Sequence, residues 1–135
     1  MENIRPILAT GAIILRDECI LIAQRKKSGT IEGLWEFPGG KVEYAESPEE
    51  CLVREIKEEL DCRISIVGLY DVSSHVYPDR RHFVILFYRC KLEEGIPKLL
   101  DHNKVKWAGI EELVDYEFVA ADRKVVKRIV EEMSK

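Results

Sequence analysis

The sequence predicts a mixed α/β fold, and three patterns support this prediction. Short apolar runs rich in β-branched residues are typical of strands, one segment carries a complete helix start signal, and the carboxyl-terminal segment has helical apolar spacing. With 135 residues and 46% hydrophobic content, the chain is long enough for one core and short for two. We therefore expect one domain over residues 1–135.

Five runs are expected to form strands, because they are short, apolar and bounded by turn-forming residues. They are residues 7–15, 19–23, 64–70, 82–92 and 105–108. The polar segment 16–18 between the first two runs predicts a tight hairpin, and residues 77–80 carry turn chemistry between the third and the fourth. Residues 26–34 are polar and contain glycine, which indicates a loop.

Two helices are expected. Ser47 as N-cap, Pro48 at the first helical position and Glu50 three residues after the cap form a strong start signal. A helix of about 13 residues should follow. It should end near Asp61, because Asp tolerates the left-handed conformation that a helix C-terminus often needs. From residue 121 to residue 133, apolar side chains recur at helical spacing among charged ones, which predicts an amphipathic helix.

The first functional pattern lies on the earlier helix. Glu55, Glu58 and Glu59 stand at positions i, i+3 and i+4, so their carboxylates fall within one arc of roughly 100°. The adjacent arc is apolar and consists of Leu52, Ile56 and Leu60. Burial of the apolar arc against a sheet would fix the direction in which the acidic arc points.

Three like charges on one helix face have two explanations, a solvated acidic face or a metal site. Mg²⁺ prefers oxygen ligands and commonly bridges carboxylates to substrate phosphates. The segment 35–40 contains Pro38, Gly39 and Gly40, which exclude ordinary helix and favour a backbone that something approaches closely. This loop and Glu46 precede the acids at fixed distances, which favours a metal site that acts on phosphates.

Composition excludes several other classes of protein. The net charge is −4, from 25 acidic and 21 basic residues, and without a long basic run we expect no direct nucleic-acid binding. No apolar run approaches the roughly 20 residues needed to span a bilayer, and the amino terminus lacks a signal-peptide pattern. We expect a cytoplasmic protein without membrane contact, in which four cysteines without CxxC spacing are reduced and mostly buried.

The loop and the acidic helix resemble the Nudix box, G-x5-E-x7-R-E-U-x-E-E-x-G-U, in which U is an aliphatic residue. The chain supplies the fixed positions in register, with Gly40, Glu46, Arg54-Glu55-Ile56 and Glu58-Glu59. Asp61 stands where the box has its last Gly, and Cys62 takes the final aliphatic place. Both follow the acids, so we expect altered stability rather than lost chemistry.

Over nearly its full length, the sequence resembles the MutT-like branch of the Nudix family. Members of this branch clean nucleotide pools or hydrolyse cytidine triphosphates. The matching segments outside the box are residues 23–25, 34–41, 77–80 and 118–122. This resemblance implies a Nudix fold, an α/β/α sandwich around a mixed sheet. It also implies hydrolysis of a nucleoside triphosphate to monophosphate and pyrophosphate, with Mg²⁺ or Mn²⁺ as cofactor and with 8-oxo-dGTP-like and (d)CTP-like substrates both open.

The resemblance further implies roles for single residues. The implied metal ligands are three helix carboxylates, one carbonyl and one loop acid: Glu55, Glu58, Glu59, Gly40 and Asp101. Glu55 or Glu58 would orient or deprotonate the attacking water, and Arg54 would hold the glutamates by ion pairing. Asp101 could equally be an ordinary loop aspartate.

Four residues are expected to bind substrate: Arg25, Phe37, Lys41 and Asp122. A guanidinium such as that of Arg25 fits phosphate, whereas the ring of Phe37 could belong to the core instead. The MutT-like branch often has Asn at the position of Asp122 to read 8-oxoguanine. An ionised Asp only accepts hydrogen bonds and would suit a base edge rich in donors, although Asp122 could also cap the last helix.

Two other functions remain open at this point. One is hydrolysis of ADP-ribose or a dinucleoside polyphosphate by the same metal helix, which the short chain disfavours. The other is a catalytically silent module that only binds nucleotide or protein, which the presence of all three box acids disfavours. A homodimer is possible through an apolar edge strand. His75, His82 and His102 lack ligand spacing and are expected to be non-catalytic.

Overall fold

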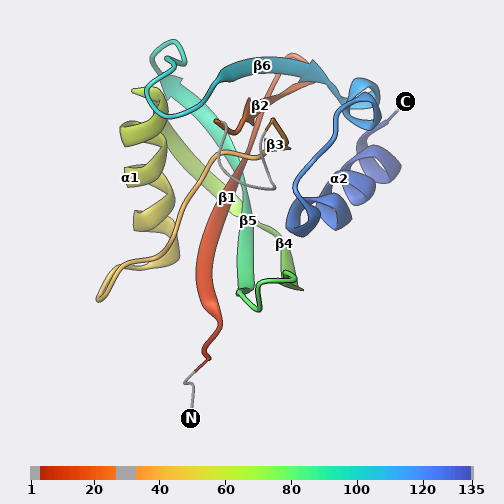
Figure 1. Ribbon diagram of the computed structural model, residues 1–135. Coiled ribbons are helices and arrows are strands. Elements are labelled where there is room, and N and C mark those ends of the chain that lie inside the picture. Colours follow the sequence, from red (N-terminus) through yellow and green to blue (C-terminus); the bar gives the residue numbers. More distant parts are fainter. Residues whose placement is uncertain (1–3, 27–32, 135) are drawn as a thin grey trace.

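The computed structural model describes residues 4–26 and 33–134 (Figure 1). Its elements in chain order are β1 (Ile7–Arg16), β2 (Cys19–Gln24), β3 (Trp35–Glu36), α1 (Pro48–Leu60), β4 (Arg63–Val76), β5 (His82–Glu94), β6 (Lys104–Gly109), the 3₁₀ helix η2 (Ile110–Asp115) and α2 (Ala120–Met133). All predicted strands and helices are present. Most of the predicted loop 26–34 lies outside the described residues. In the described part of the chain, no helix is long and apolar enough to cross a membrane.

β1 is the central strand of a mixed sheet. From Ile7 to Ile14 it pairs in parallel with β5, which in turn pairs antiparallel with β4. At Leu15 and Arg16 it enters the predicted hairpin with β2, and β2 pairs antiparallel with β3 and β6. The strand order is therefore β3-β2-β1-β5-β4 with β6 on β2, which confirms the predicted mixed sheet.

The strands bury side chains in two cores, one on each face. Ile13 and Ile20 belong to the core that contains the α2 side chains. Ile14 and Leu21 belong to the core that contains the α1 side chains, together with the thiol of Cys90. Because α1 and α2 lie on opposite sides of the strands (Figure 1), the α/β/α sandwich that the resemblance implied is confirmed.

β4 is longer than the sequence predicted. The missed residues 71–76 pair with β5 in regular register, but their sequence Asp-Val-Ser-Ser-His-Val is mostly polar, so the apolar run ends before the strand does. β4 also forms an edge of the sheet and exposes Val67, Leu69, Val72 and Val76. Pairing of two copies along this edge stays a prediction.

Two short elements were not predicted. β3 has two residues, which is too short for a periodic pattern, and it joins the sheet because Ala23 and Gln24 of β2 lie opposite it. η2 has six residues and links β6 to α2. β3 matters for function, because it carries Glu36 directly before the glycine loop.

Candidate active site

α1 begins and ends where its sequence signals indicated. The Oγ of Ser47 accepts a bond from the backbone N–H of Glu50, and Glu50 Oε1 accepts one from the N–H of Ser47, both at 3.1 Å. The helix runs for 13 residues and ends at Asp61, which has the left-handed φ of 54°. Its apolar arc is fully buried at Leu52, Ile56 and Leu60, so the acidic arc has a fixed direction.

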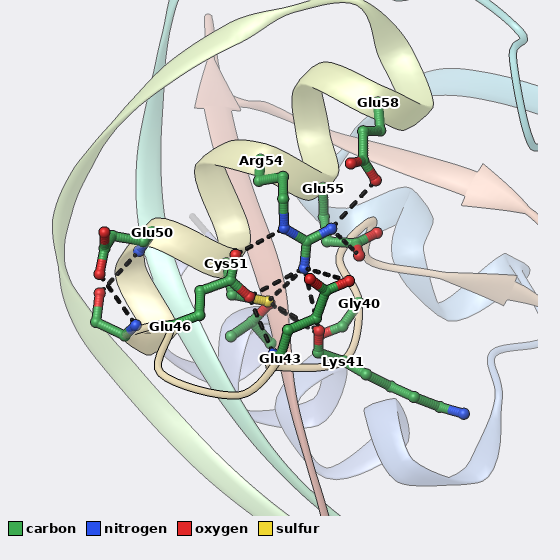
Figure 2. A network of polar contacts seen from close by, with 11 residues as sticks. Gly40, Lys41, Glu43, Glu46, Glu50, Cys51, Arg54, Glu55 and Glu58 are labelled. Carbon is green, nitrogen blue, oxygen red and sulfur yellow. Dashed lines mark hydrogen bonds and ion pairs between the residues drawn. The ribbon is translucent and has the colours of Figure 1, made fainter.

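The guanidinium of Arg54 joins three carboxylates of the box (Figure 2). Its Nε and Nη2 donate to the two oxygens of Glu46 at 2.6 and 3.0 Å. Its Nη1 donates to Glu55 at 2.8 Å and to Glu58 at 3.1 Å. The bonds from Arg54 hold the pKa of Glu46 down at about 2. These contacts are those that an ion-pairing role for Arg54 requires.

Glu59 differs from the other acids of α1 because it is half-buried and, in the described part of the chain, one of its carboxylate oxygens is buried without a partner. Burial, with the nearby charges of Glu36, Glu55 and Asp101, raises the pKa of Glu59 to about 9. Its Oε2 is buried without a hydrogen-bond partner among the described residues. An anionic Glu59 therefore needs a cation, and hard oxygen donors of this kind fit Mg²⁺ or Mn²⁺.

The carboxylates are not already arranged as a metal cage. Across residues 4–26 and 33–134, no three side chains of His, Cys, Asp or Glu are grouped in a way that could hold an ion. Arg54 holds Glu55 and Glu58, and the side chain of Glu58 is 59% exposed. The residues fit a divalent cation by their chemistry, and Glu59 is the acid whose buried oxygen most requires one.

The glycine loop is packed closely, as its composition predicted. A Cβ at Gly39 would lie 2.0 Å from the carbonyl oxygen of Thr10 in β1, and a Cβ at Gly40 would lie 2.2 Å from the carboxyl carbon of Glu55. The carbonyl of Pro38 accepts a bond from Ala12 at 2.8 Å. The groups that approach this backbone are therefore β1 and the acidic helix.

The Gly40 carbonyl accepts hydrogen bonds from β1, and its role as a metal ligand stays a prediction. It accepts from the backbone N–H of Thr10 at 2.8 Å and from the Thr10 hydroxyl at 3.2 Å. The thiol of Cys51 also lies 3.5 Å from it. These bonds fasten the loop to β1.

A cavity of about 400 Å³ lies beside this loop. Its lining includes seven of the predicted site residues: Arg25, Phe37, Gly40, Lys41, Glu59, Asp101 and Asp122. Arg54, Glu55 and Glu58 are not part of the lining. The sequence analysis missed eight further lining residues with polar or aromatic side chains: Thr10, Lys26, Glu36, Tyr77, Arg81, Phe83, Phe87 and His102.

Asp122 is buried at the start of α2. Its Oδ2 accepts a bond from the backbone N–H of Phe37 at 2.9 Å. Burial raises the pKa of Asp122 well above its usual value, against the lowering effect of the Phe37 N–H. Burial therefore shifts Asp122 toward its protonated form, which can also donate, whereas the sequence analysis considered only the ionised form; the substrate-binding role of Asp122 stays a prediction.

Two alternatives from the sequence are also decided here. Val119, not Asp122, is the N-cap of α2, and no side chain caps it. The ring of Phe37 belongs to the core, 4% exposed, with ring centroids 5.4 Å from Phe118 and 6.0 Å from Phe87. Phe37 still borders the cavity, and its N–H fixes the Asp122 carboxyl.

Comparison with known proteins agrees with this geometry. The sequence matches the NUDIX domain over residues 5–129. The chain belongs to the Nudix family. It is an enzyme of the Nudix hydrolase type, similar to proteins named as diphosphatases.

Individual Nudix relatives cover most of the chain. The 8-oxo-dGTP diphosphatase of Proteus vulgaris is 40% identical over 88 residues, which cover 65% of this chain and 78% of that protein. The CTP pyrophosphohydrolase of Escherichia coli is 37% identical over 116 residues, 86% of this chain and 85% of that protein. The crystal structure of the MutT NUDIX hydrolase from Burkholderia pseudomallei superposes with a TM-score of 0.81 at 29% identity, covering 91% of this chain and 97% of that one.

Within this Nudix hydrolase, the box and the cavity meet at Glu59 and the glycine loop. Glu59 lines the cavity and contacts Glu55, which brings the Arg54 network to its wall. Of the three histidines, His82 bonds to Ser74 and His75 packs on Tyr77, outside the cavity lining. His102 does line the cavity, and its position beside Asp101 was the only sequence signal that could have revealed it.

Proposed function

We propose that the chain hydrolyses nucleoside triphosphates to monophosphate and pyrophosphate with Mg²⁺, or Mn²⁺, and that it removes altered or surplus nucleotides. The observation that carries this proposal is the composition of the cavity wall. One cavity is lined by the acids Glu59 and Asp101, the cations Arg25 and Lys41, and the buried hydrogen-bonding group of Asp122. These are the groups needed for a metal ion, a polyphosphate and a base.

We assign the metal ion to Glu59, Glu55 and Asp101. A bound Mg²⁺ would neutralise charge on the phosphoryl oxygens and lower the pKa of the attacking water. Between the two candidates for accepting the proton of that water, Glu55 is better placed than Glu58. Glu55 contacts Glu59, whereas the side chain of Glu58 is 59% exposed. Arg54 would hold Glu55 in place, and Arg25 and Lys41 would bind phosphate oxygens.

The chemistry of Asp122 supports two substrate classes. A protonated carboxyl offers one donor and one acceptor side by side, as an Asn amide does. Cytosine presents an acceptor beside its amino donor, and 8-oxoguanine presents O6 beside the N7 hydrogen. Unmodified guanine has two acceptors, O6 and N7, on that edge. Asp122 would therefore favour CTP and 8-oxo-dGTP over GTP, in line with the names of the relatives.

The test is a product assay with purified protein and Mg²⁺. The panel contains canonical and oxidised nucleoside triphosphates, ADP-ribose and dinucleoside polyphosphates, with Glu55→Gln and a chelator as controls. We expect pyrophosphate and monophosphate from CTP or 8-oxo-dGTP, and loss of both products in the controls. Faster cleavage of ADP-ribose would contradict the triphosphate assignment. Nucleotide binding without any product would favour a silent binding module.

A further inference from the structure

A chain of hydrogen bonds crosses the cavity wall from His102 to Arg25. The Nε2 of His102 lies 2.9 Å from Oε2 of Glu36, and the other oxygen of Glu36 accepts a bond from Arg25 Nη1 at 2.8 Å. The three residues come from the loop before β6, from β3, and from the segment after β2. All three line the cavity. The Glu36 carboxylate is therefore held at both of its oxygens.

The geometry assigns the hydrogen on the His102 ring. A carboxylate only accepts hydrogen bonds, so Nε2 carries the hydrogen that Glu36 receives. The Nδ1 atom is buried without a partner among the described residues. The side chain of His102 is 3% exposed, against 17% for Glu36 and 36% for Arg25. Exposure therefore increases along the chain of hydrogen bonds, from the imidazole of His102 to the guanidinium of Arg25.

We propose that His102 is a positioning residue, which acts through Glu36 to hold the Arg25 guanidinium ready for substrate phosphate. This inference rests on the proposed function. Arg25 donates from Nη1 to Glu36, and its Nε is buried without a partner in the described structure. The guanidinium is therefore fixed through one of its nitrogens. An arginine fixed before binding loses less side-chain entropy when phosphate binds.

A purely structural role for His102 makes a different prediction. If the buried ring only supported the loop, its loss would displace Asp101 and lower kcat whatever residue stood at position 25. If it positions Arg25, its loss raises KM, and the rise disappears once Arg25 is removed. The two roles therefore separate in a double-mutant cycle.

The cycle uses His102→Phe, Arg25→Ala and the double variant, assayed with Mg²⁺ on CTP or 8-oxo-dGTP, whichever the wild type hydrolyses faster. We expect His102→Phe to raise KM about tenfold and to change kcat less than about threefold. In the Arg25→Ala background the same change should add little. His102→Gln, which keeps an N–H donor, should recover part of the KM. His82→Phe, outside the cavity lining, is the matched control and should behave as wild type.

A spectroscopic measurement keeps this test independent of turnover. In ¹⁵N spectra of the wild type, we expect His102 to carry its hydrogen on Nε2. The Nε–Hε signal of Arg25, assigned by its loss in Arg25→Ala, should shift in His102→Phe and not in His82→Phe. If no nucleotide is hydrolysed but this shift occurs, the proposed function fails and the positioning contact stands. An unmoved Arg25 signal, equal KM effects in both backgrounds, or a fall in kcat alone would overturn the inference.

Discussion

The two carboxylate environments of the candidate site, one around Arg54 and one at Asp122, differ in how each controls charge. Glu46 before α1 and Glu55 and Glu58 on α1 share the guanidinium of Arg54 at distances of 2.6 to 3.1 Å, and the bonds from Arg54 lower the pKa of Glu46. At the start of α2, Asp122 has a buried carboxyl bonded to a backbone N–H, and burial favours its protonated form. The first environment suits a cation and phosphates, and the second suits hydrogen bonds to a neutral base.

Glu59 lies between these two cases, because it belongs to α1 and is half-buried, with one carboxylate oxygen buried without a partner among the described residues. Its raised pKa shows that the fold keeps an acid where the ionised form is unfavourable without a cation. Such an arrangement lowers stability in favour of function. We therefore expect substitutions at the α1 acids and at Asp122 to differ in how strongly they change activity and in how they change stability.

The largest expected effect is that of Glu59→Gln. We expect kcat/KM to fall by about 10³-fold, because an amide is a poor ligand for a hard cation. Without metal, the variant should be more stable than wild type. Glu59 has a pKa raised from 4.5 to about 9, so the wild type loses stability as pH rises through this interval, and Gln does not. Thermal unfolding with chelator at pH 5 and pH 8 measures this, and equal Tm values at pH 8 would contradict it.

The glycine loop should show the next largest effects, and its two glycines should differ. In Gly39→Ala the new methyl meets the backbone oxygen of Thr10, which cannot rotate away, so we expect a loss of about 3 kcal/mol or more. In Gly40→Ala the methyl meets the Glu55 side chain, which can move. That variant should stay folded and lose about 10- to 100-fold in activity. Urea unfolding with activity assays tests the pair, and equal destabilisation of both would contradict this difference.

Features formed by residues close together in the sequence could be predicted, and contacts between residues far apart in the sequence could not. The helix of residues 48–60, its cap, its left-handed end at Asp61 and its acidic face could be predicted because these patterns are local. The contacts between Asp122 and Phe37, and between His102 and Glu36, join residues 85 and 66 positions apart. No local pattern reports such contacts. The raised pKa of Asp122 could not be predicted for the same reason, because burial is a property of the assembled fold.

Asp122→Asn should have a smaller effect on activity than substitutions at the acids of α1. Asn keeps the acceptor for Phe37 N–H and offers a donor, so we expect the ranking of CTP, 8-oxo-dGTP and GTP to stay the same near pH 7. At higher pH the wild type should lose selectivity as Asp122 ionises, and the variant should not. Steady-state kinetics between pH 6 and pH 9 give this comparison, with Asp122→Leu as the control that removes the hydrogen bonds.

The same variant should alter stability with a defined pH dependence. The raised pKa means that folded Asp122 binds a proton more tightly than unfolded Asp122, so wild-type stability falls as pH rises above 3.8. Asp122→Asn should therefore raise Tm by a few degrees at pH 8 and by less at pH 5. A pH-independent difference in Tm would mean that Asp122 is ionised in the folded protein, which would restore the acceptor-only interpretation.

The smallest expected effect is that of Asp61→Gly, which restores the usual residue of the box. Gly removes the cost of a left-handed φ of 54°, but it also removes the carboxylate that Lys57 and Lys98 contact at 2.5 and 3.0 Å. Exposed ion pairs weaken as salt rises, whereas backbone strain does not. We expect the Tm of Asp61→Gly to differ from that of wild type by less than about 4 °C at low salt. At 0.5 M salt the variant should have the higher Tm. Its activity should stay within about twofold of wild type. A variant that stays less stable than wild type at high salt would show that Asp61 stabilises the end of α1 by more than ion pairing.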